Sequence, residues 1–196
     1  MNIIDWPDIC PSSLTWQLES NSKSFRSPFN GTTQTVRYPG SRWRCSLTVN
    51  NLRDDDARKI DALIAALDGE YGRVRLRDYG RGGRVANGSP VVAVNGQTGG
   101  HLITSGWVPS MLVLKIGDYI TVNDELKIIT EDISSSVTGN AELVFSPVLR
   151  TSPPMGFKIE TQNPSGIFKL RDNNQGVSNR VPGVFSSYVI EFEEAF

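Results

Sequence analysis

Residues 72–84 read GRVRLRDYGRGGR and hold five arginines in thirteen positions. The first half alternates strictly, so the arginines at 73, 75 and 77 point to one side of an extended strand and the two apolar residues between them point to the other. The second half, YGRGGR, is rich in glycine and is expected to form a flexible linker. A strand with a charged face therefore leads directly into a linker, and the character of the sequence changes beyond it.

The region after this linker is predicted to form a small β-barrel. It contains several short apolar segments, among them SPVVAVN, GGHLITSGW, MLVLKIGDYITV, ELKIIT and AELVFSPVL. Asn123-Asp124 separates YITV from ELKII and is typical of a tight hairpin turn. About five short strands with no good helix predict a five-stranded barrel of the OB type over residues 84–151.

After residue 151 the sequence again resembles the first region, with strands that carry charged residues. GFKIE and GIFKLRDNN are short predicted strands, and GVFSSYVIEFEEAF at 183–196 is a long final one. Neither end of the chain has the apolar surface to close a core alone. We therefore expect residues 1–83 and 152–196 to form one discontinuous domain that the barrel at 84–151 interrupts. The predicted fold class is mainly β: a discontinuous β-sandwich-like domain with one α-helix, plus an inserted small OB-type barrel.

Two elements of the first region have clear periodicity. SRWRCSLTVN at 41–50 alternates over eight residues, which predicts a half-buried strand with Trp43 and Cys45 on its buried side. About residues 54–68, apolar side chains recur at helical spacing and predict an amphipathic helix. Three aspartates in its first turn interact favourably with the helix dipole, and Gly69 stands just past its end as an expected C′ residue.

Composition limits the classes of function. The formal net charge is −1, whereas a protein whose main task is to hold duplex DNA is usually basic. Cys10 and Cys45 have no metal-binding spacing, and Cys45 is interpreted as a reduced core thiol in a reducing compartment. The first residues show no signal peptide, and no apolar stretch is long enough to span a membrane.

Motifs for catalysis are not found. The sequence lacks a G-x-S-x-G elbow, an H-E-x-x-H pair and a Walker pattern. His101, the single histidine, lies in a glycine-rich run without a nucleophile motif and is interpreted as non-catalytic. The run at 54–56 does not suit a metal, because neighbouring helical side chains diverge by about 100°. We expect no enzymatic activity, no metal and no cofactor.

Two charged surfaces remain as candidate interaction sites. An arginine face and a glutamate face are expected to lie either against one another within one subunit, against the next copy of the protein, or along a channel. We also expect the strand that carries Arg42 and Arg44 to lie beside the strand at 73–77. The candidate residues for an inter-subunit or lumen surface are Arg42, Arg44, Arg73, Arg75, Arg77, Glu191 and Glu193.

The order of these segments resembles that of the distal tail proteins of long-tailed bacteriophages. A β segment, a strand, one amphipathic helix and a charged strand precede a barrel with the phrase LKIGDYITVNDELKIIT…AELVFSPVL, and the last strands return to the first domain. The resemblance covers nearly the whole chain and is strongest for the subgroup whose inserted domain is an OB fold. It does not include a diagnostic catalytic motif.

This resemblance implies a structural role at the virion tail tip, with assembly in the host cytoplasm. Such proteins form a hexameric ring that joins the tail tube protein to the hub or tip protein, near the tape measure protein, and DNA passes through the ring without sequence readout. Neither a cofactor nor a membrane is implied. Two alternatives are a nucleic-acid-binding module of the OB type and a carbohydrate-binding tail-tip module, for which an exposed Trp107 would be the only indication.

Overall fold

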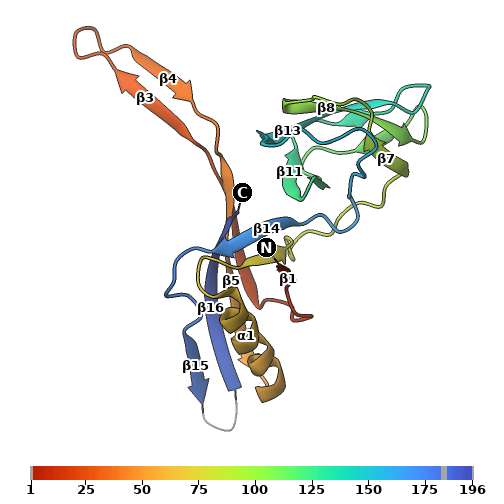
Figure 1. The fold of residues 1–196 in the computed structure, drawn as a ribbon. Helices are drawn as coiled ribbons and strands as arrows, with labels where there is room; N and C mark the ends of the chain where they lie inside the picture. Colours follow the sequence, from red (N-terminus) through yellow and green to blue (C-terminus); the bar gives the residue numbers. More distant parts are fainter. Residues whose placement is uncertain (1, 182–184, 196) are drawn as a thin grey trace.

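The computed structural model describes residues 2–181 and 185–195 and is mainly β, with one helix among these residues. The largest element is a seven-stranded sheet in the order β1-β6-β14-β16-β5-β2, with β15 paired to β16 (Figure 1). Its members are β1 (Ile3–Asp5), β2 (Ser13–Glu19), β5 (Arg42–Leu52), β6 (Arg73–Leu76), β14 (Gly166–Leu170), β15 (Ser178–Val181) and β16 (Phe185–Glu194).

Strands from both ends of the chain share this sheet. β14 and β16 lie between β6 and β5, so the two early strands are separated by two late ones. The prediction that Arg42 and Arg44 lie on a neighbour of the 73–77 strand is therefore wrong. Sequence proximity favoured that pairing, but β16 has the longer complementary register with β5, from Ser186 opposite Leu52 to Glu193 opposite Arg44.

Helix α1 (Asp54–Leu67) covers one face of the sheet, and its buried side chains are Ala57, Ile60, Leu63 and Leu67. The hydroxyl of Tyr188, on β16, donates to Asp61 Oδ1 at 2.8 Å and so fixes the helix to the sheet. The helix ends one residue earlier than predicted, because Asp68 already adopts a left-handed conformation with φ 49°. Gly69 follows with φ 64°, so Asp68 and Gly69 both have left-handed backbone conformations that end the helix.

The expected sandwich-like packing of two sheets within the first region is not observed among the described residues. The inner face of the seven-stranded sheet is covered by α1 and by side chains from residues 119–128. Trp43 packs edge-on against Tyr119, with ring centroids 5.6 Å apart, and its indole N–H donates to the carbonyl of Leu126 at 3.0 Å. One core therefore contains residues from both regions of the chain.

A β-hairpin, here called the arm, extends away from the body of the molecule (Figure 1). It consists of β3 (Ser22–Arg26) and β4 (Thr33–Arg37), which pair only with each other among the described strands. β3 is exposed throughout, and only Val36 of β4 is half-buried. The arm interrupts the chain between β2 and β5, so the sheet continues from one to the other across its base.

Residues 88–149 build a second, five-stranded sheet in the order β10-β11-β13-β8-β7. Its strands are β7 (Gly88–Val92), β8 (Gly99–Trp107), β10 (Tyr119–Val122), β11 (Glu125–Ile129) and β13 (Ala141–Leu149), accompanied by the short pair β9 (Leu112–Leu114) and β12 (Ile133–Ser134). The predicted turn between β10 and β11 is confirmed. Asn123 and Asp124 have φ values of 51° and 60°, as a two-residue type I′ hairpin requires.

The segment 157–160 links the two edges of this second sheet. Lys158 bridges to Val91 on β7, and Glu160 bridges to Thr121 on β10. The amide of Ile159 donates to the carbonyl of Pro90, and the amide of Val92 donates to that of Phe157. The expected boundary at 151/152 assigned this segment to the first region, but its backbone hydrogen bonds join it to the second sheet. Its short apolar pattern alone does not indicate which sheet it completes.

Candidate interaction surface

The outer face of the seven-stranded sheet is the face that α1 does not cover. The strand register aligns Gln17, Arg44, Glu193 and Lys169 in one row across β2, β5, β16 and β14. A second row aligns Thr15, Ser46 and Glu191. These rows follow from the alternation of polar and apolar residues in each strand, because the apolar positions between them point into the core. Four predicted site residues, Arg42, Arg44, Glu191 and Glu193, therefore belong to one face.

These charges are paired within the chain. Glu193 accepts from Arg42 at 3.4 Å and lies 3.1 Å from the ammonium group of Lys169. Arg44 lies 2.9 Å from Glu19 and 3.8 Å from Glu193. The charged residues of this row are thus cations and anions that lie beside one another within one chain.

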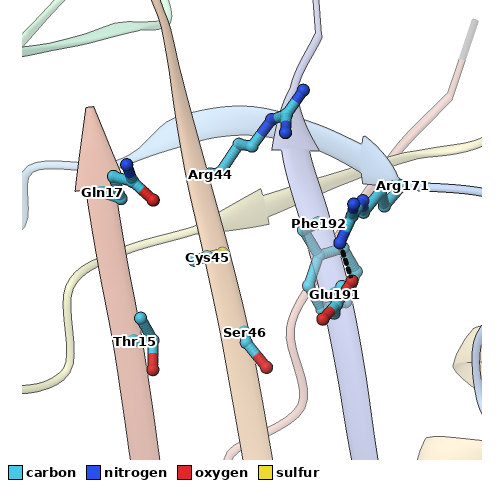
Figure 2. A pocket seen from close by; sticks show the side chains of 8 residues that line it. All are labelled: Thr15, Gln17, Arg44, Cys45, Ser46, Arg171, Glu191 and Phe192. Atoms are coloured by element: carbon cyan, nitrogen blue, oxygen red, sulfur yellow. Dashed lines mark hydrogen bonds and ion pairs between the residues drawn. The ribbon is translucent and has the colours of Figure 1, made fainter. Parts of the chain in front are cut away.

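Arg171 and Glu191 form a further ion pair at the edge of a shallow depression of about 180 Å³ (Figure 2). The hydrogen bond to Glu191 raises the pKa of Arg171. The depression is lined by Thr15, Gln17, Arg44, Cys45, Ser46, Arg171, Glu191 and Phe192. Burial raises the pKa of the Cys45 thiol well above its ordinary value, so this group is not a nucleophile at neutral pH. The prediction that Cys45 is a core residue is confirmed.

Arg73 and Arg75 on β6, and Arg77 just after it, have different partners from the arginines on β5. Arg73 donates to the backbone carbonyls of residues 70, 71 and 72. Arg75 lies 2.8 Å from Asp124, in the β10–β11 turn. Arg77 donates to Asn163 at 3.3 Å and stacks over the ring of Tyr79. The predicted arginine face is therefore divided. The β5 arginines form a charged row, whereas Arg73 binds local backbone, Arg75 binds the adjoining second sheet, and Arg77 binds Asn163 and Tyr79.

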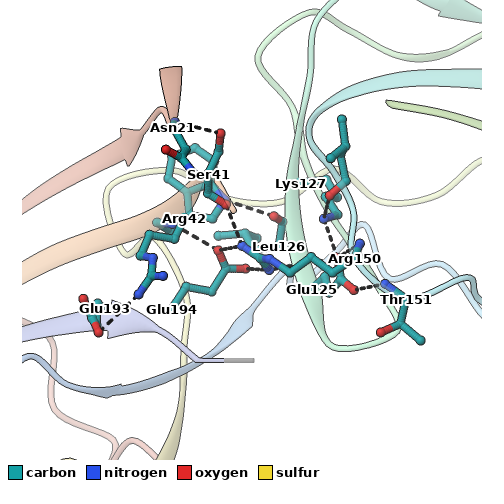
Figure 3. A network of polar contacts seen from close by, with 12 residues as sticks. Asn21, Ser41, Arg42, Glu125, Leu126, Lys127, Arg150, Thr151, Glu193 and Glu194 are labelled. Atoms are coloured by element: carbon teal, nitrogen blue, oxygen red, sulfur yellow. Dashed lines mark hydrogen bonds and ion pairs between the residues drawn. The ribbon is translucent and has the colours of Figure 1, made fainter. Parts of the chain in front are cut away.

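Sequence reasoning missed an ionic cluster that joins the two sheets (Figure 3). Arg150 donates through two nitrogens to Glu194, at 2.9 and 2.6 Å, and also to the carbonyl of Ser41 at 2.8 Å. The backbone amide of Trp43 donates to Glu194 at 3.0 Å. Glu194 is only 2% exposed, so this carboxylate depends on its donors.

The other half of the cluster lies on β11. Lys127 is fully buried, and its ammonium group contacts Glu125 at 2.5 Å and the carbonyl of Val148 at 3.0 Å. Desolvation lowers the pKa of Lys127, and the neighbouring Glu125 opposes that shift. Glu125 also accepts the backbone amides of Arg150 and Thr151. The sequence did contain a signal for this cluster. Glu194 continues the buried alternation of Tyr188, Ile190 and Phe192, and Lys127 interrupts an apolar strand.

Two other predicted positions have plain environments. His101 is exposed, and its Nδ1 lies 3.1 Å from Glu142 on the neighbouring strand. Trp107 is only 3% exposed and donates to Thr104 Oγ1 at 2.8 Å, so the side chain that would have supported the carbohydrate-binding alternative is a core residue. Its apolar ring is held in the core of the second sheet.

Exposed apolar side chains gather at the far end of the outer face. Val181 lies directly opposite Phe185 in the β15–β16 pair, and Val189 follows on the same side of β16. The exposed fractions are 62% for Val181, 44% for Phe185 and 54% for Val189. Exposed apolar groups that adjoin one another are typical of protein contact sites.

Within the described ranges no group of His, Cys, Asp and Glu residues could hold a metal ion. No helix there is long and apolar enough to cross a membrane. No known protein family matches the chain, and no curated protein matches it either.

Proposed function

We propose that this protein is a structural component of the tail tip of a long-tailed bacteriophage. It forms a ring, a hexamer by the resemblance stated above, that joins the tail tube protein to the hub or tip protein, next to the tape measure protein, and lets DNA pass. Its location is the virion tail tip after assembly in the host cytoplasm. It has no enzymatic activity and no cofactor.

The observation that carries this proposal is the interleaved seven-stranded sheet. Its strands come from residues 3–76 and 166–194, and a separate five-stranded sheet is built from the residues between them. This order supports a discontinuous ring-forming domain with an insertion, in the arrangement that the resemblance implies. The residues 157–160 extend the proposed insertion beyond 151.

An OB-type barrel is the proposed form of the insertion. β10, β11 and β13 are consecutive neighbours, and the earlier strand β8 lies beside β13. This is a Greek-key order read from the carboxyl end, and OB folds are small Greek-key barrels. The bridges of residues 158 and 160 to both edge strands support closure.

The surfaces of the chain favour an assembly protein over a nucleic-acid-binding module. The predicted arginines are engaged by carboxylates, backbone carbonyls or an amide within the chain. The second sheet contributes only two lysines, Lys115 and Lys127, and Lys127 is buried. Binding of single strands needs a basic groove with exposed aromatic platforms. Exposed apolar groups such as Val181 and Phe185 instead suit protein contacts.

Assembly is the direct test. Purified protein is examined by mass photometry and negative-stain microscopy over a range of concentrations, alone and with the tail tube protein of the same phage. We expect closed rings or concentration-dependent oligomers, because a heterologous contact that closes yields a ring. A protein that stays monomeric in both conditions, and that binds single-stranded DNA in a salt-dependent way, would contradict the proposal and favour the alternative.

A further inference from the structure

The arm is the least explained part of the chain. It is a two-stranded hairpin whose residues are almost all exposed, and an isolated hairpin of this kind is marginally stable in water. Its turn is nevertheless held by several hydrogen bonds. The amide of Ser27 donates to the carbonyl of Thr32 at 2.8 Å, and the Asn30 side-chain oxygen accepts from the amide and the hydroxyl of Thr32. The turn presents Phe29, which is 97% exposed.

One face of the arm mixes apolar and polar side chains. Lys23 lies opposite Val36 and Phe25 lies opposite Gln34, so these four side chains share a face. Phe25 is 54% exposed. The other face is polar, with Ser24 and Thr35 hydrogen-bonded across the strands at 2.8 Å. The arm thus has one polar face and one mixed face, on which Val36 is half-buried and Phe25 is more than half exposed.

The charge of the arm indicates what covers it. Residues 22–37 contain Lys23, Arg26 and Arg37 and no acidic residue. The second sheet and its loops, residues 88–149, have the opposite balance, with two lysines against Asp118, Asp124, Glu125, Glu131, Asp132 and Glu142. A cationic, aromatic arm and an acidic sheet on the same chain are the two dissimilar surfaces that a head-to-tail contact between copies requires.

Four of these six carboxylates form ion pairs within the chain, and two form none with a described residue. Asp118 pairs with Arg84, Asp124 with Arg75, and Glu142 with His101. Glu131 and Asp132 are exposed and form no ion pair with a described residue. Asp132 accepts the backbone amide of Ile116 at 2.9 Å, which brings a 67% exposed apolar side chain next to the two acids. We call Ile116, Glu131 and Asp132 the acidic patch.

We propose that the arm of one copy binds the acidic patch of the next copy, with Phe29 against Ile116 and the cations of the arm against Glu131 and Asp132. The arm and the second sheet extend in different directions from the same end of the seven-stranded sheet, so neighbours placed side by side bring them together (Figure 1). This inference rests on the proposed ring and assigns the contact that links its subunits.

Cysteine cross-linking tests the contact directly. Phe29→Cys protein is mixed with Ile116→Cys protein, both carrying Cys10→Ser because Cys10 is exposed, and the mixture is mildly oxidised. We expect a disulfide-linked dimer that contains one chain of each kind. The matched control is Val177→Cys, which is also exposed and apolar but lies outside the acidic patch. Equal cross-linking to the control would overturn the proposal.

Charge exchange gives an independent readout. Lys23→Glu with Arg26→Glu should weaken self-association about tenfold or more, as should Glu131→Lys with Asp132→Lys. A chain with all four changes should recover the association of the native protein. All of these side chains are exposed, so melting temperatures serve as the check on folding. Only the Asp132→Lys change should lower the melting temperature slightly, because it removes the hydrogen bond to the amide of Ile116.

The outcomes separate the two proposals. If rings form and these variants assemble as well as the native chain without the specific cross-link, the arm contact is wrong and the ring remains. If the native protein does not associate alone or with tail tube protein, both proposals fall.

Discussion

Glu194 is a carboxylate on the buried side of β16, and its surroundings show how a charge is accommodated there. Two nitrogens of Arg150 and the amide of Trp43 donate to it. Transfer of an ion from water into a protein interior costs several kcal/mol unless such donors replace the solvent. The cluster therefore adds little net stability, but it determines how the second sheet is oriented on the first, because Arg150 comes from the end of β13.

Removal of one partner of this pair should be strongly destabilising. We expect Arg150→Met to lower the free energy of unfolding by about 3 kcal/mol or more, since Glu194 would remain buried without its cation. The measurement is urea denaturation followed by tryptophan fluorescence. The control is the double variant with Glu194→Gln, which should recover much of the loss. A double variant as unstable as the single one would argue against the pairing.

The helix α1 shows the same physics at the level of an element. Its first turn carries Asp54, Asp55 and Asp56, which interact favourably with the positive end of the helix dipole. Asp54 pairs with Arg58, and Asp56 with Lys59, on the exposed side. The N-cap residue is Arg53, which has extended backbone angles but makes no side-chain capping hydrogen bond. The helix is thus held by its buried stripe and its aspartates rather than by a cap.

A cap should therefore stabilise the protein. We expect Arg53→Ser to raise the free energy of unfolding by about 1 kcal/mol, because a serine hydroxyl accepts a backbone N–H of the first turn. Arg53→Ala is the matched control, since it removes the same side chain without supplying a cap, and it should change stability little. Thermal and urea unfolding of the three proteins provide the comparison. Equal stability of the serine and alanine variants would contradict this account.

At the scale of the whole molecule, the interleaved sheet makes the two ends of the chain depend on each other. β5 pairs with β16 and β6 pairs with β14, so the two inner early strands each have a late neighbour. The first core also includes Tyr119 and Leu126 from the second sheet. Folding therefore requires contacts between residues far apart in sequence, which is typical of slow, cooperative β folding.

A fragment that ends at residue 84 should not fold. It retains β5, α1 and β6, but it lacks both late strands and the aromatic residues that cover Trp43. We expect poor amide dispersion in its NMR spectrum and a non-cooperative thermal transition, in contrast to the full chain. A well-dispersed spectrum with a cooperative transition would show that the early segment closes a core by itself, and the discontinuous domain would then be wrong.

Local pattern predicted much of the fold. The alternation at 41–50 identified β5 and its buried side, the helical spacing identified α1, and Asn123-Asp124 identified the β10–β11 turn. The same alternation predicted that the side chains of four charged residues point away from the core: Arg42, Arg44, Glu191 and Glu193. Each of these features depends on a few adjacent residues, whose side-chain directions follow from backbone period alone.

The amino-acid sequence by itself determined which segments are strands, where the helix lies and which side of each strand is polar. Only the tertiary structure decided that β14 and β16 separate β5 from β6, that Arg75 meets Asp124, and that residues 157–160 join the second sheet. The physical reason is that periodicity is a local property, whereas strand order depends on the free energy of closing long loops and on which distant surfaces complete a core.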